Sequence, residues 1–424
     1  MPDEVGYLLS LLGAIRKENF GLERMEALMS ALGHPERESG IVHIAGTNGK
    51  GSTAAMIESV LLEHGQTTGL YTSPHLSRIN ERYRINGREA CSDALASAIR
   101  RVRSANERIV SRMGRSRHPT FFESCTAVAL VLFAQSGVRW KIVETGLGGR
   151  LDASNVVRPH LAVITRVGRD HERFLGLSLA AVAAEKAGIA KADRPVVIGP
   201  QAPKAREALL LGCARAGAPV VDAGTDWRAT ERELVGGRWH FTARGPEAQV
   251  RIRLGVRGEH QIENALTATV AMWCLGIPAS SIAGGMAKAE WPGRLELRPG
   301  TPPVLLDAAH NPSGARALAR FLGREAKGRR LTLIYGSSRD KAIDEVAAWL
   351  FPLAERVILT RSRVARAASP EALLRVAGHH HRSAETAPNV VEAMRIARRE
   401  TPSQGWIVVA GSLFLVGEAR ELLG

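Results

Sequence analysis

The chain has 424 residues, a length that suggests two or three domains. Apolar residues make up 45% of it and charged residues 23%, which excludes a disordered or fibrous protein. The formal net charge is +15, but the basic residues are spread along the whole chain and only 5% of residues are aromatic. This pattern favours a solvated basic surface over a nucleic-acid interface.

The sequence also argues against export and against a membrane anchor. The longest apolar run, Ala127–Ala134, is far shorter than the ~20 residues of a membrane-spanning helix. Residues 1–4 supply neither the basic start nor the apolar core of a signal peptide. The four cysteines lie far apart and lack metal-ligand spacing: Cys91, Cys125, Cys213 and Cys274. We therefore expect a cytoplasmic protein with reduced, buried thiols.

Short apolar runs alternate with amphipathic segments from residue 41 onward, which is typical of an α/β protein with a mainly parallel sheet. The expected strands of this part are 41–45, 68–71, 141–144, 161–165, 195–198 and 219–221. The expected helices are 52–64, 92–113, 122–136, 178–190 and 260–274. Residues 228–256 alternate with a period of two between glycine-rich turns, which predicts a small antiparallel sheet.

Residues 298–303 contain three prolines and a glycine, a composition that excludes a helix or a central strand. We interpret them as a hinge linker between an N-terminal domain, 1–297, and a C-terminal domain, 304–424. Apolar runs at 304–307, 331–335, 356–360 and 406–410 predict the strands of this second α/β domain. The run His379–His381 fits either a metal clip or a solvated loop, and the loop is the simpler interpretation.

The strongest motif lies between the strand 41–45 and the helix that follows it. Its glycines let successive backbone N–H groups approach phosphate oxygens, and the helix N-terminus adds positive potential. Lys50 can reach the terminal phosphates, whereas a glycine-rich turn without a ligand needs neither a lysine nor hydroxyl groups. The predicted ATP-binding loop consists of Gly46, Thr47, Asn48, Gly49, Lys50, Gly51, Ser52 and Thr53.

Four further residues are expected near this loop. Ser73 follows the strand 68–71, Glu144 ends the strand 141–144, and His171 follows the strand 161–165. Lys186 stands in an apolar helix. The carboxyl ends of parallel strands meet at one edge of a sheet, where a carboxylate beside a phosphate loop can hold Mg²⁺. Each residue alone has an ordinary structural explanation, but together they indicate a metal–phosphate site.

These stretches resemble the motifs of the Mur ligase superfamily, and the glycine after Lys50 resembles its folylpolyglutamate synthase and dihydrofolate synthase branch. The resemblance runs over nearly the whole chain. It implies an α/β fold with a large P-loop-containing ATP-binding domain of Mur-ligase type and a smaller, Rossmann-like C-terminal domain. It also implies one or two Mg²⁺ ions, held by Ser73, Glu144, His171 and an N-carboxylated Lys186, and it allows a K⁺ ion.

The same resemblance assigns roles near the domain boundary. Asn264, Arg294 and Asp307 are implied to contact the nucleotide, and His310 to lie near the reacting centre. The implied catalytic residues are therefore Lys50, Lys186 and His310. Ala308 stands where the family has glycine. The turn tolerates the methyl group of alanine if the φ of Ala308 is negative.

A pteroate or folate pocket is implied by three further segments. Its residues would be Gly21, Leu22, Glu23, Thr120, Phe121, Phe122, Glu123, Leu151, Asp152 and Ala153. Arg166 and Arg169 depart from the family pattern around His171. They either alter the local field or contact an anionic substrate.

The implied enzyme is an ATP-dependent amide ligase. It would add L-glutamate to dihydropteroate, to the γ-carboxylate of folates, or to both, through an acyl phosphate. The expected partners are these small molecules, without nucleic acid or membrane, and the expected state is a monomer. Three different functions stay open: a cell-wall ligase of the same superfamily, an ATP-switched nucleic-acid-binding protein and a non-catalytic relative.

Overall fold

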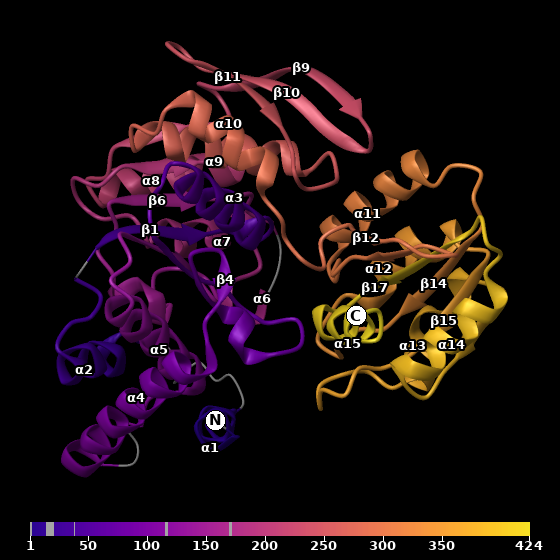
Figure 1. Cartoon of the computed structure of the whole chain (residues 1–424), viewed down its shortest axis with the longest axis horizontal. Helices are drawn as coiled ribbons and strands as arrows, with labels where there is room; N and C mark the ends of the chain where they lie inside the picture. Colours follow the sequence, from indigo (N-terminus) through magenta and orange to yellow (C-terminus); the bar gives the residue numbers. More distant parts are fainter. Residues whose placement is uncertain (1, 14–20, 38, 115–117, 169–171) are drawn as a thin grey trace.

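The computed structural model describes residues 2–13, 21–37, 39–114, 118–168 and 172–424. Two α/β bodies follow one another along the chain, each built around its own sheet (Figure 1). Among the described residues, no helix is both long and apolar enough to cross a membrane.

An eight-stranded sheet forms the centre of the N-terminal domain, in the order β4-β3-β2-β5-β1-β6-β7-β8. Its strands are β1 (Gly40–Ala45), β2 (Thr68–Tyr71), β3 (Tyr83–Ile85), β4 (Arg88–Glu89), β5 (Trp140–Glu144), β6 (Leu161–Ile164), β7 (Val196–Ile198) and β8 (Val220–Asp222). The strands from β2 to β8 in this order pair in parallel, whereas β3 and β4 extend the edge in antiparallel fashion. The predicted mainly parallel sheet is thereby confirmed, and the carboxyl ends of its central strands share one edge.

Helices cover both faces of this sheet. One face carries α3 (Lys50–Glu63), α9 (Gln261–Cys274) and α10 (Ala279–Lys288). The other helices in the described part of the domain are α1 (Pro2–Ser10), α2 (Glu23–Leu32), η2 (Ile79–Arg82), α4 (Ser92–Met113), α5 (Phe121–Gln135), η4 (Ala153–Val156), α6 (Glu172–Leu175), α7 (Leu179–Ala187) and α8 (Pro203–Arg215). Because strand side chains alternate between faces, Val42 and Ile44 pack beneath α3, whereas Ile41 and Ala45 pack into the cores on the other face.

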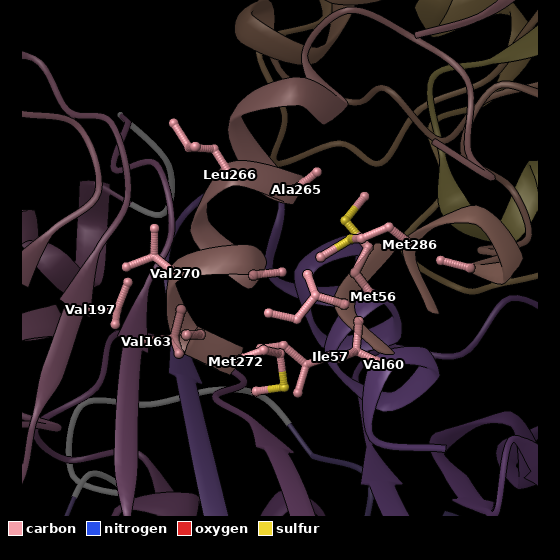
Figure 2. Close-up of a cluster of buried hydrophobic side chains, with 14 of the residues drawn as sticks. Met56, Ile57, Val60, Val163, Val197, Ala265, Leu266, Val270, Met272 and Met286 are labelled. Carbon is pink, nitrogen blue, oxygen red and sulfur yellow. The ribbon is translucent and has the colours of Figure 1, made fainter. Parts of the chain in front are cut away.

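The core beneath α3 fixes the helix that begins in the predicted phosphate loop. Met56, Ile57 and Val60 of α3 are fully buried and lie against Met272 and Met286 (Figure 2). This packing anchors α3 over its length, so the loop at its N-terminus is held by a rigid element.

The expected antiparallel patch is also confirmed. It consists of β9 (Arg228–Val235), β10 (Arg238–Arg244) and β11 (Gln249–Arg253), and it lies over α9 and α10 (Figure 1). Phe241 and Ile252 point from it into the core beneath α3.

A six-stranded sheet with the order β12-β13-β17-β14-β15-β16 forms the C-terminal domain. Its strands are β12 (Glu296–Arg298), β13 (Val304–Leu306), β14 (Leu331–Tyr335), β15 (Arg356–Leu359), β16 (Ala384–Thr386) and β17 (Trp406–Ala410). The helices α11 (Pro312–Glu325), α12 (Ile343–Leu350) and α13 (Pro370–Ala377) pack on one face, and α14 (Val390–Glu400) and α15 (Leu413–Glu421) on the other. The short helices η5 (Phe351–Leu353) and η6 (Gly378–His380) complete it.

The predicted hinge at 298–303 is wrong. Residues 296–298 form β12, which pairs antiparallel with β13 so that Glu296 lies opposite Leu306 and Arg298 opposite Val304. The prolines and the glycine therefore make the turn of a hairpin inside the C-terminal sheet. A segment rich in proline and glycine forms neither helix nor central strand, whether it is a hairpin turn or a linker between domains. Composition alone therefore does not distinguish a turn from a linker. The chain enters the C-terminal sheet at residue 296.

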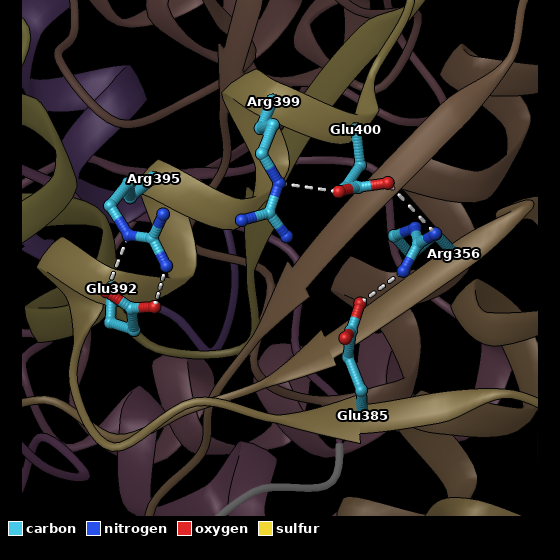
Figure 3. Close-up of polar contacts among 6 residues, drawn as sticks. All are labelled: Arg356, Glu385, Glu392, Arg395, Arg399 and Glu400. Carbon is cyan, nitrogen blue, oxygen red and sulfur yellow. Dashed lines mark hydrogen bonds and ion pairs between the residues drawn. The ribbon is translucent and has the colours of Figure 1, made fainter.

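Ion pairs on the outside of this domain join its last elements. Arg356 of β15 contacts Glu385 of β16 at 2.7 Å and Glu400 of α14 at 3.4 Å, while Glu392 pairs with Arg395 (Figure 3). Exposed pairs of this kind contribute about 0–1 kcal/mol each. Some of the many arginines of the chain are therefore surface residues that form ion pairs.

The cysteines are free thiols. Cys125 and Cys213 are buried, as predicted, and Cys274 is partly buried. The prediction of a buried thiol is wrong for Cys91, which is exposed at the N-cap position of α4.

Candidate nucleotide and metal site

The loop of residues 46–53 joins β1 to α3, as the motif predicts. Gly49 takes a left-handed conformation with φ 85°, and no side chain caps α3 at this position. A Cβ at Gly49 would collide with the side chain of Asn264. The residue before the first turn of α3 must therefore be glycine. The free N–H groups of that turn form the kind of helix N-terminus that binds phosphate oxygens.

Neighbouring strand ends brace this loop. The Thr165 hydroxyl, at the end of β6, donates to the carbonyl of Asn48 at 2.8 Å, and the Thr47 hydroxyl donates to the carbonyl of Gly168 at 3.0 Å. From α9, the Gln261 amide donates to the Ser52 hydroxyl at 3.2 Å. The loop is thus held from several sides before any ligand binds.

Lys50 and Glu144 meet beside the loop. The Nζ of Lys50 lies 3.8 Å from Oε1 of Glu144, and the backbone N–H of Ser73 donates to Oε2 at 3.2 Å. Burial raises the pKa of Glu144, while the charge of Lys50, the N–H of Ser73 and the charge of Arg294 oppose that shift. Three predicted residues from three separate strand ends are therefore brought together.

Lys186 reaches the same loop from α7. Its side chain is only 3% exposed, and Nζ donates to the carbonyl of Gly46 at 2.8 Å. The chain fits closely here, because a Cβ at Gly149 would lie 2.7 Å from the carbonyl oxygen of Glu185. The apolar helix thus delivers a buried amine to the phosphate loop and not to the surface.

The fourth predicted metal ligand, His171, lies outside the described residues, and so does Arg169. Arg166 is described and forms an exposed ion pair with Glu263 of α9, at 2.8 Å. Its backbone carbonyl accepts from the N–H groups of Thr47 and Asn48.

The C-terminal domain contacts the phosphate loop directly. The Asn311 amide donates to Oδ1 of Asn48 at 3.1 Å, and Oδ1 of Asn311 caps α11 by accepting from the N–H of Gly314. Nδ1 of His310 donates to the carbonyl of Ala308 at 2.9 Å. Ala308 does not take a positive φ, so the methyl group that replaces the family glycine is tolerated as predicted.

Asp307 has a structural task besides the implied nucleotide contact. Its carboxylate accepts from the N–H groups of Leu295 and Ala309, both at 2.9 Å. Burial raises the pKa of Asp307, and the charge of Arg294 opposes the shift. Arg294 thus acts electrostatically on both Asp307 and Glu144, which belong to different domains.

Trp291 explains the departure of the loop from the commoner lysine–serine spacing. A Cβ at Gly51 would lie 2.9 Å from the indole ring of Trp291. The tryptophan occupies the space that a side chain after Lys50 would need, so the glycine is required by packing.

The implied pteroate residues gather around the start of α5. Thr120 and Glu123 form a capping box, and Glu123 also pairs with Arg24 of α2 at 3.0 Å. The Phe122 ring packs so closely against Gly146 that a Cβ there would collide with it. The segments at 21–23, 120–123 and 145–153 are therefore neighbours.

Asp152 and Glu123 are satisfied within the protein. The carboxylate of Asp152 accepts from the backbone of Gly146, Leu147 and Ser154 and from the Ser154 hydroxyl. Ser154 in turn is hydrogen-bonded to His43 of β1 at 2.8 Å. The two acids hold the walls of this region in place.

Sequence reasoning missed Arg82 and His75. The Nε–H of Arg82 donates to Nδ1 of His75 at 2.9 Å, and its guanidinium lies 5.4 Å from the centre of the Phe121 ring. The His75 ring meets Phe414 of α15 edge-on at 6.2 Å. No local pattern marks these residues, because the contacts join η2, α5 and the C-terminal domain.

Three histidines of the N-terminal domain are kept neutral by burial. Burial lowers the pKa of His43 from 6.5 to about 3, assisted by the charge of Lys191. It lowers the pKa of His75 and of His260 to about 4, assisted by the charges of Arg82 and Arg294 respectively.

This burial predicts a pH dependence of stability. Below pH 6.5 the unfolded chain binds a proton at His260 that the folded chain does not, so stability falls as the pH drops toward 4. Buried carboxylates with a raised pKa, such as Glu144, change the stability in the opposite direction as the pH falls. The contribution of His260 is therefore measured as the difference between the native protein and a His260 variant. When the pH is lowered from 7.5 to 5.5, the free energy of unfolding measured in urea should fall by about 1 kcal/mol more for the native protein than for His260→Asn. Parallel pH profiles would contradict the assignment.

Comparison with known proteins agrees with this geometry. Residues 44–272 match the Mur ligase middle domain, and residues 293–413 match the Mur ligase glutamate ligase domain. The fold and the site together define a Mur-type ligase that uses ATP and a divalent metal ion.

Similar proteins show to which branch of the Mur ligases the chain belongs. The dihydrofolate synthase/folylpolyglutamate synthase of Bacillus subtilis is 33% identical over 412 residues, 95% of each chain. The structure of Mycobacterium tuberculosis folylpolyglutamate synthase complexed with ADP is 34% identical, with a TM-score of 0.93, and the match covers 99% of this chain and 98% of that one. A bifunctional folylpolyglutamate synthase/dihydrofolate synthase with Mn, AMPPNP and L-glutamate bound is 29% identical, with a TM-score of 0.85 and 99% and 97% coverage. The chain belongs to the dihydrofolate synthase/folylpolyglutamate synthase family, and it is an ATP-dependent glutamate ligase.

Proposed function

We propose that the enzyme has both activities of its family, adding L-glutamate to dihydropteroate and to the γ-carboxylate of folates. The observation that carries the ATP-dependent step common to both reactions is the convergence on one loop of a buried carboxylate, two lysines and a residue of the second domain. Lys50 and Glu144 are 3.8 Å apart, Lys186 binds the carbonyl of Gly46, and Asn311 contacts Asn48.

The donors present fit Mg·ATP. Glu144 offers a buried carboxylate and Ser73 a hydroxyl, and oxygen ligands of this kind suit Mg²⁺. The glycine backbone and the uncapped start of α3 suit the phosphates, with Lys50 beside them. When bound, the metal ion supplies positive charge to the phosphates. The contribution of His171, the number of Mg²⁺ ions and the K⁺ ion stay predictions.

The reaction that these residues serve needs an activated acid. The substrate carboxylate attacks the γ-phosphorus of ATP, ADP leaves, and an acyl phosphate forms. The amine of L-glutamate then attacks the acyl carbon and phosphate leaves. Lys50 neutralises charge that develops on the transferred group, so the protein acts by positioning and electrostatics. The contact of Asn311 with Asn48 lets the second domain close over the loop and keep water from the acyl phosphate.

The pterin end of the substrate is assigned to the region at the start of α5. Phe121 and Phe122 are half-buried there, and aromatic faces can stack on a planar ring. The nearby carboxylates of Glu123 and Asp152 hold the walls by the contacts described above. Gly21, Leu22 and Glu23 border the same region through the ion pair of Arg24 with Glu123.

The test is an ADP-release assay with purified enzyme. Dihydropteroate and tetrahydrofolate are each supplied with ATP and Mg²⁺, with and without L-glutamate. We expect ADP release with either acid, dependent on glutamate, and a product extended by one glutamate by mass spectrometry. Turnover of only one acid would overturn the dual activity, and turnover of neither would overturn the folate assignment.

A different function would give a different result in this assay. A cell-wall ligase would release ADP with a nucleotide-linked peptide acid, and an ATP-switched nucleic-acid-binding protein would show ATPase activity stimulated by DNA or RNA. The monomeric state and the cytoplasmic location stay predictions, and light scattering of the purified protein tests the first.

A further inference from the structure

The histidine run at residues 379–381 forms a cluster with an acid from another helix. His379 and His380 lie in η6, just after α13, and Asp344 lies in the first turn of α12. Oδ1 of Asp344 is 2.9 Å from Nε2 of His380 and 3.3 Å from Nε2 of His379. One oxygen thus faces both imidazoles.

The third histidine is turned away from the cluster. Nε2 of His381 donates to the carbonyl of Ala354 at 3.1 Å, and its Nδ1 accepts from the N–H of Ser383 at 3.3 Å. His381 therefore fastens the segment, while His379 and His380 present their Nε2 atoms on the other side. The two rings lie with their centres 4.0 Å apart.

The spacing of the three ligand atoms suits a metal ion. They lie within 4.8 Å of one another. With metal–ligand bonds of about 2.0–2.1 Å, neighbouring ligands are about 3.3 Å apart in a tetrahedron and about 2.9 Å apart in an octahedron. The two distances from Asp344 to the histidines match these edges, so an ion could enter with small side-chain rotations.

We propose that Asp344, His379 and His380 form a site for a divalent transition-metal ion, with Zn²⁺ as its representative. Two imidazoles and one carboxylate suit zinc and its neighbours, whereas Mg²⁺ and Ca²⁺ prefer all-oxygen sites. Three protein ligands leave at least one position for water or an outside ligand. The site is separate in its residues from the one that holds the nucleotide.

The competing account is an ion pair without metal. In that account each Nε2–H donates to Oδ1 of Asp344, and one carboxylate oxygen can accept both hydrogen bonds. A bound metal ion would replace both of these hydrogen bonds, so zinc binding separates the two accounts.

Binding would tie α12 to the segment that follows α13. Helices α12 and α13 pack on the same face of the C-terminal sheet. An ion that binds the folded chain and not the unfolded one stabilises the fold by mass action, so added zinc should raise the midpoint of thermal unfolding.

The test uses the full-length, untagged protein freed of metal by chelation. Zinc affinity is measured by competition with a chromophoric chelator, and thermal unfolding is followed with and without ZnCl₂. We expect the H379A/H380A variant to lose one zinc equivalent, or to bind it more weakly by over ~100-fold, since losing even an outer-shell partner costs ~10–100-fold. The zinc-dependent rise in the unfolding midpoint should disappear with it.

His381→Ala is the matched control, because it removes a histidine of the same run that faces away from Asp344. It should keep the zinc affinity of the native protein, and Asp344→Asn should weaken it. Equal zinc binding by native protein and H379A/H380A, or no zinc binding by the native protein, would overturn the proposal in favour of the ion pair. Zinc held at the nucleotide site does not confuse the result, because that site is intact in every variant.

Discussion

Lys50→Met should lower the kcat for glutamate-dependent ADP release by about 10²–10³-fold. Methionine keeps much of the length and volume of lysine but carries no charge. The native Nζ lies beside Glu144 at the start of α3, where the charge of a transferred phosphoryl group would develop. The loss should therefore fall on kcat, while the KM of the pterin substrate, assigned to the start of α5, changes little. Steady-state kinetics with each substrate varied in turn measure both.

Lys288→Met supplies the matched control for that variant. Lys288 lies at the end of α10 with a side chain 68% exposed, where it pairs with Glu63 at 2.6 Å. The same change of charge there should leave kcat within about twofold of the native value, because exposed pairs contribute little. If Lys50→Met behaved like Lys288→Met while folding normally by circular dichroism, the loop would not be the phosphate site.

The parts of the site that sequence predicts are those encoded by neighbours in the chain. The strand, glycine loop and helix around Lys50 are consecutive, so the local pattern suffices to place them. Glu144 is expected beside them because the carboxyl ends of parallel strands share an edge, and its 3.8 Å distance from Lys50 agrees. Lys186 follows the same logic, since its helix begins after the neighbouring strand β6.

Contacts between residues far apart in the chain are not predictable in this way. The hydrogen bond between Asn48 and Asn311 spans 263 residues, and the packing of Trp291 on Gly51 joins the segment after α10 to the start of α3. No periodicity encodes which residues meet across a domain boundary. The same limit explains the error at 298–303, because the pairing of β12 with β13 is a property of the sheet and not of the turn.

Some roles are encoded locally and are still easily overlooked. Thr120 and Glu123 have the spacing of a capping box, which explains both residues without a ligand. Asp152 followed by Ser154 likewise predicts a turn in which the carboxylate accepts backbone N–H groups. A residue that a family places near a substrate can therefore act by holding the wall of the pocket.

Lys186→Ala should lower kcat about as strongly as Lys50→Met, by about 10²–10³-fold. The implied N-carboxylation turns a cation into an anion beside the metal site. An amine reacts with carbon dioxide through its nitrogen, so the reaction needs Nζ close to the site where the carboxylate is used. Lys186 is only 3% exposed, with Nζ 2.8 Å from the carbonyl of Gly46. Replacing it with alanine would remove the negative group and leave space in which a small acid fits.

Added formate or acetate should therefore restore part of the activity of Lys186→Ala, in a dose-dependent way, and should not affect Lys191→Ala. Lys191 is the matched control, because it follows α7 and donates to the carbonyl of Asn155 at 3.3 Å without reaching the loop. Carbon-13 bicarbonate should also label the native enzyme and not Lys186→Ala in an NMR spectrum. If short carboxylates gave no rescue and no label appeared, Lys186 would act as an amine. Its hydrogen bond to Gly46 would then be its contribution, and Lys186→Gln, which can keep that bond, would retain more activity than Lys186→Ala.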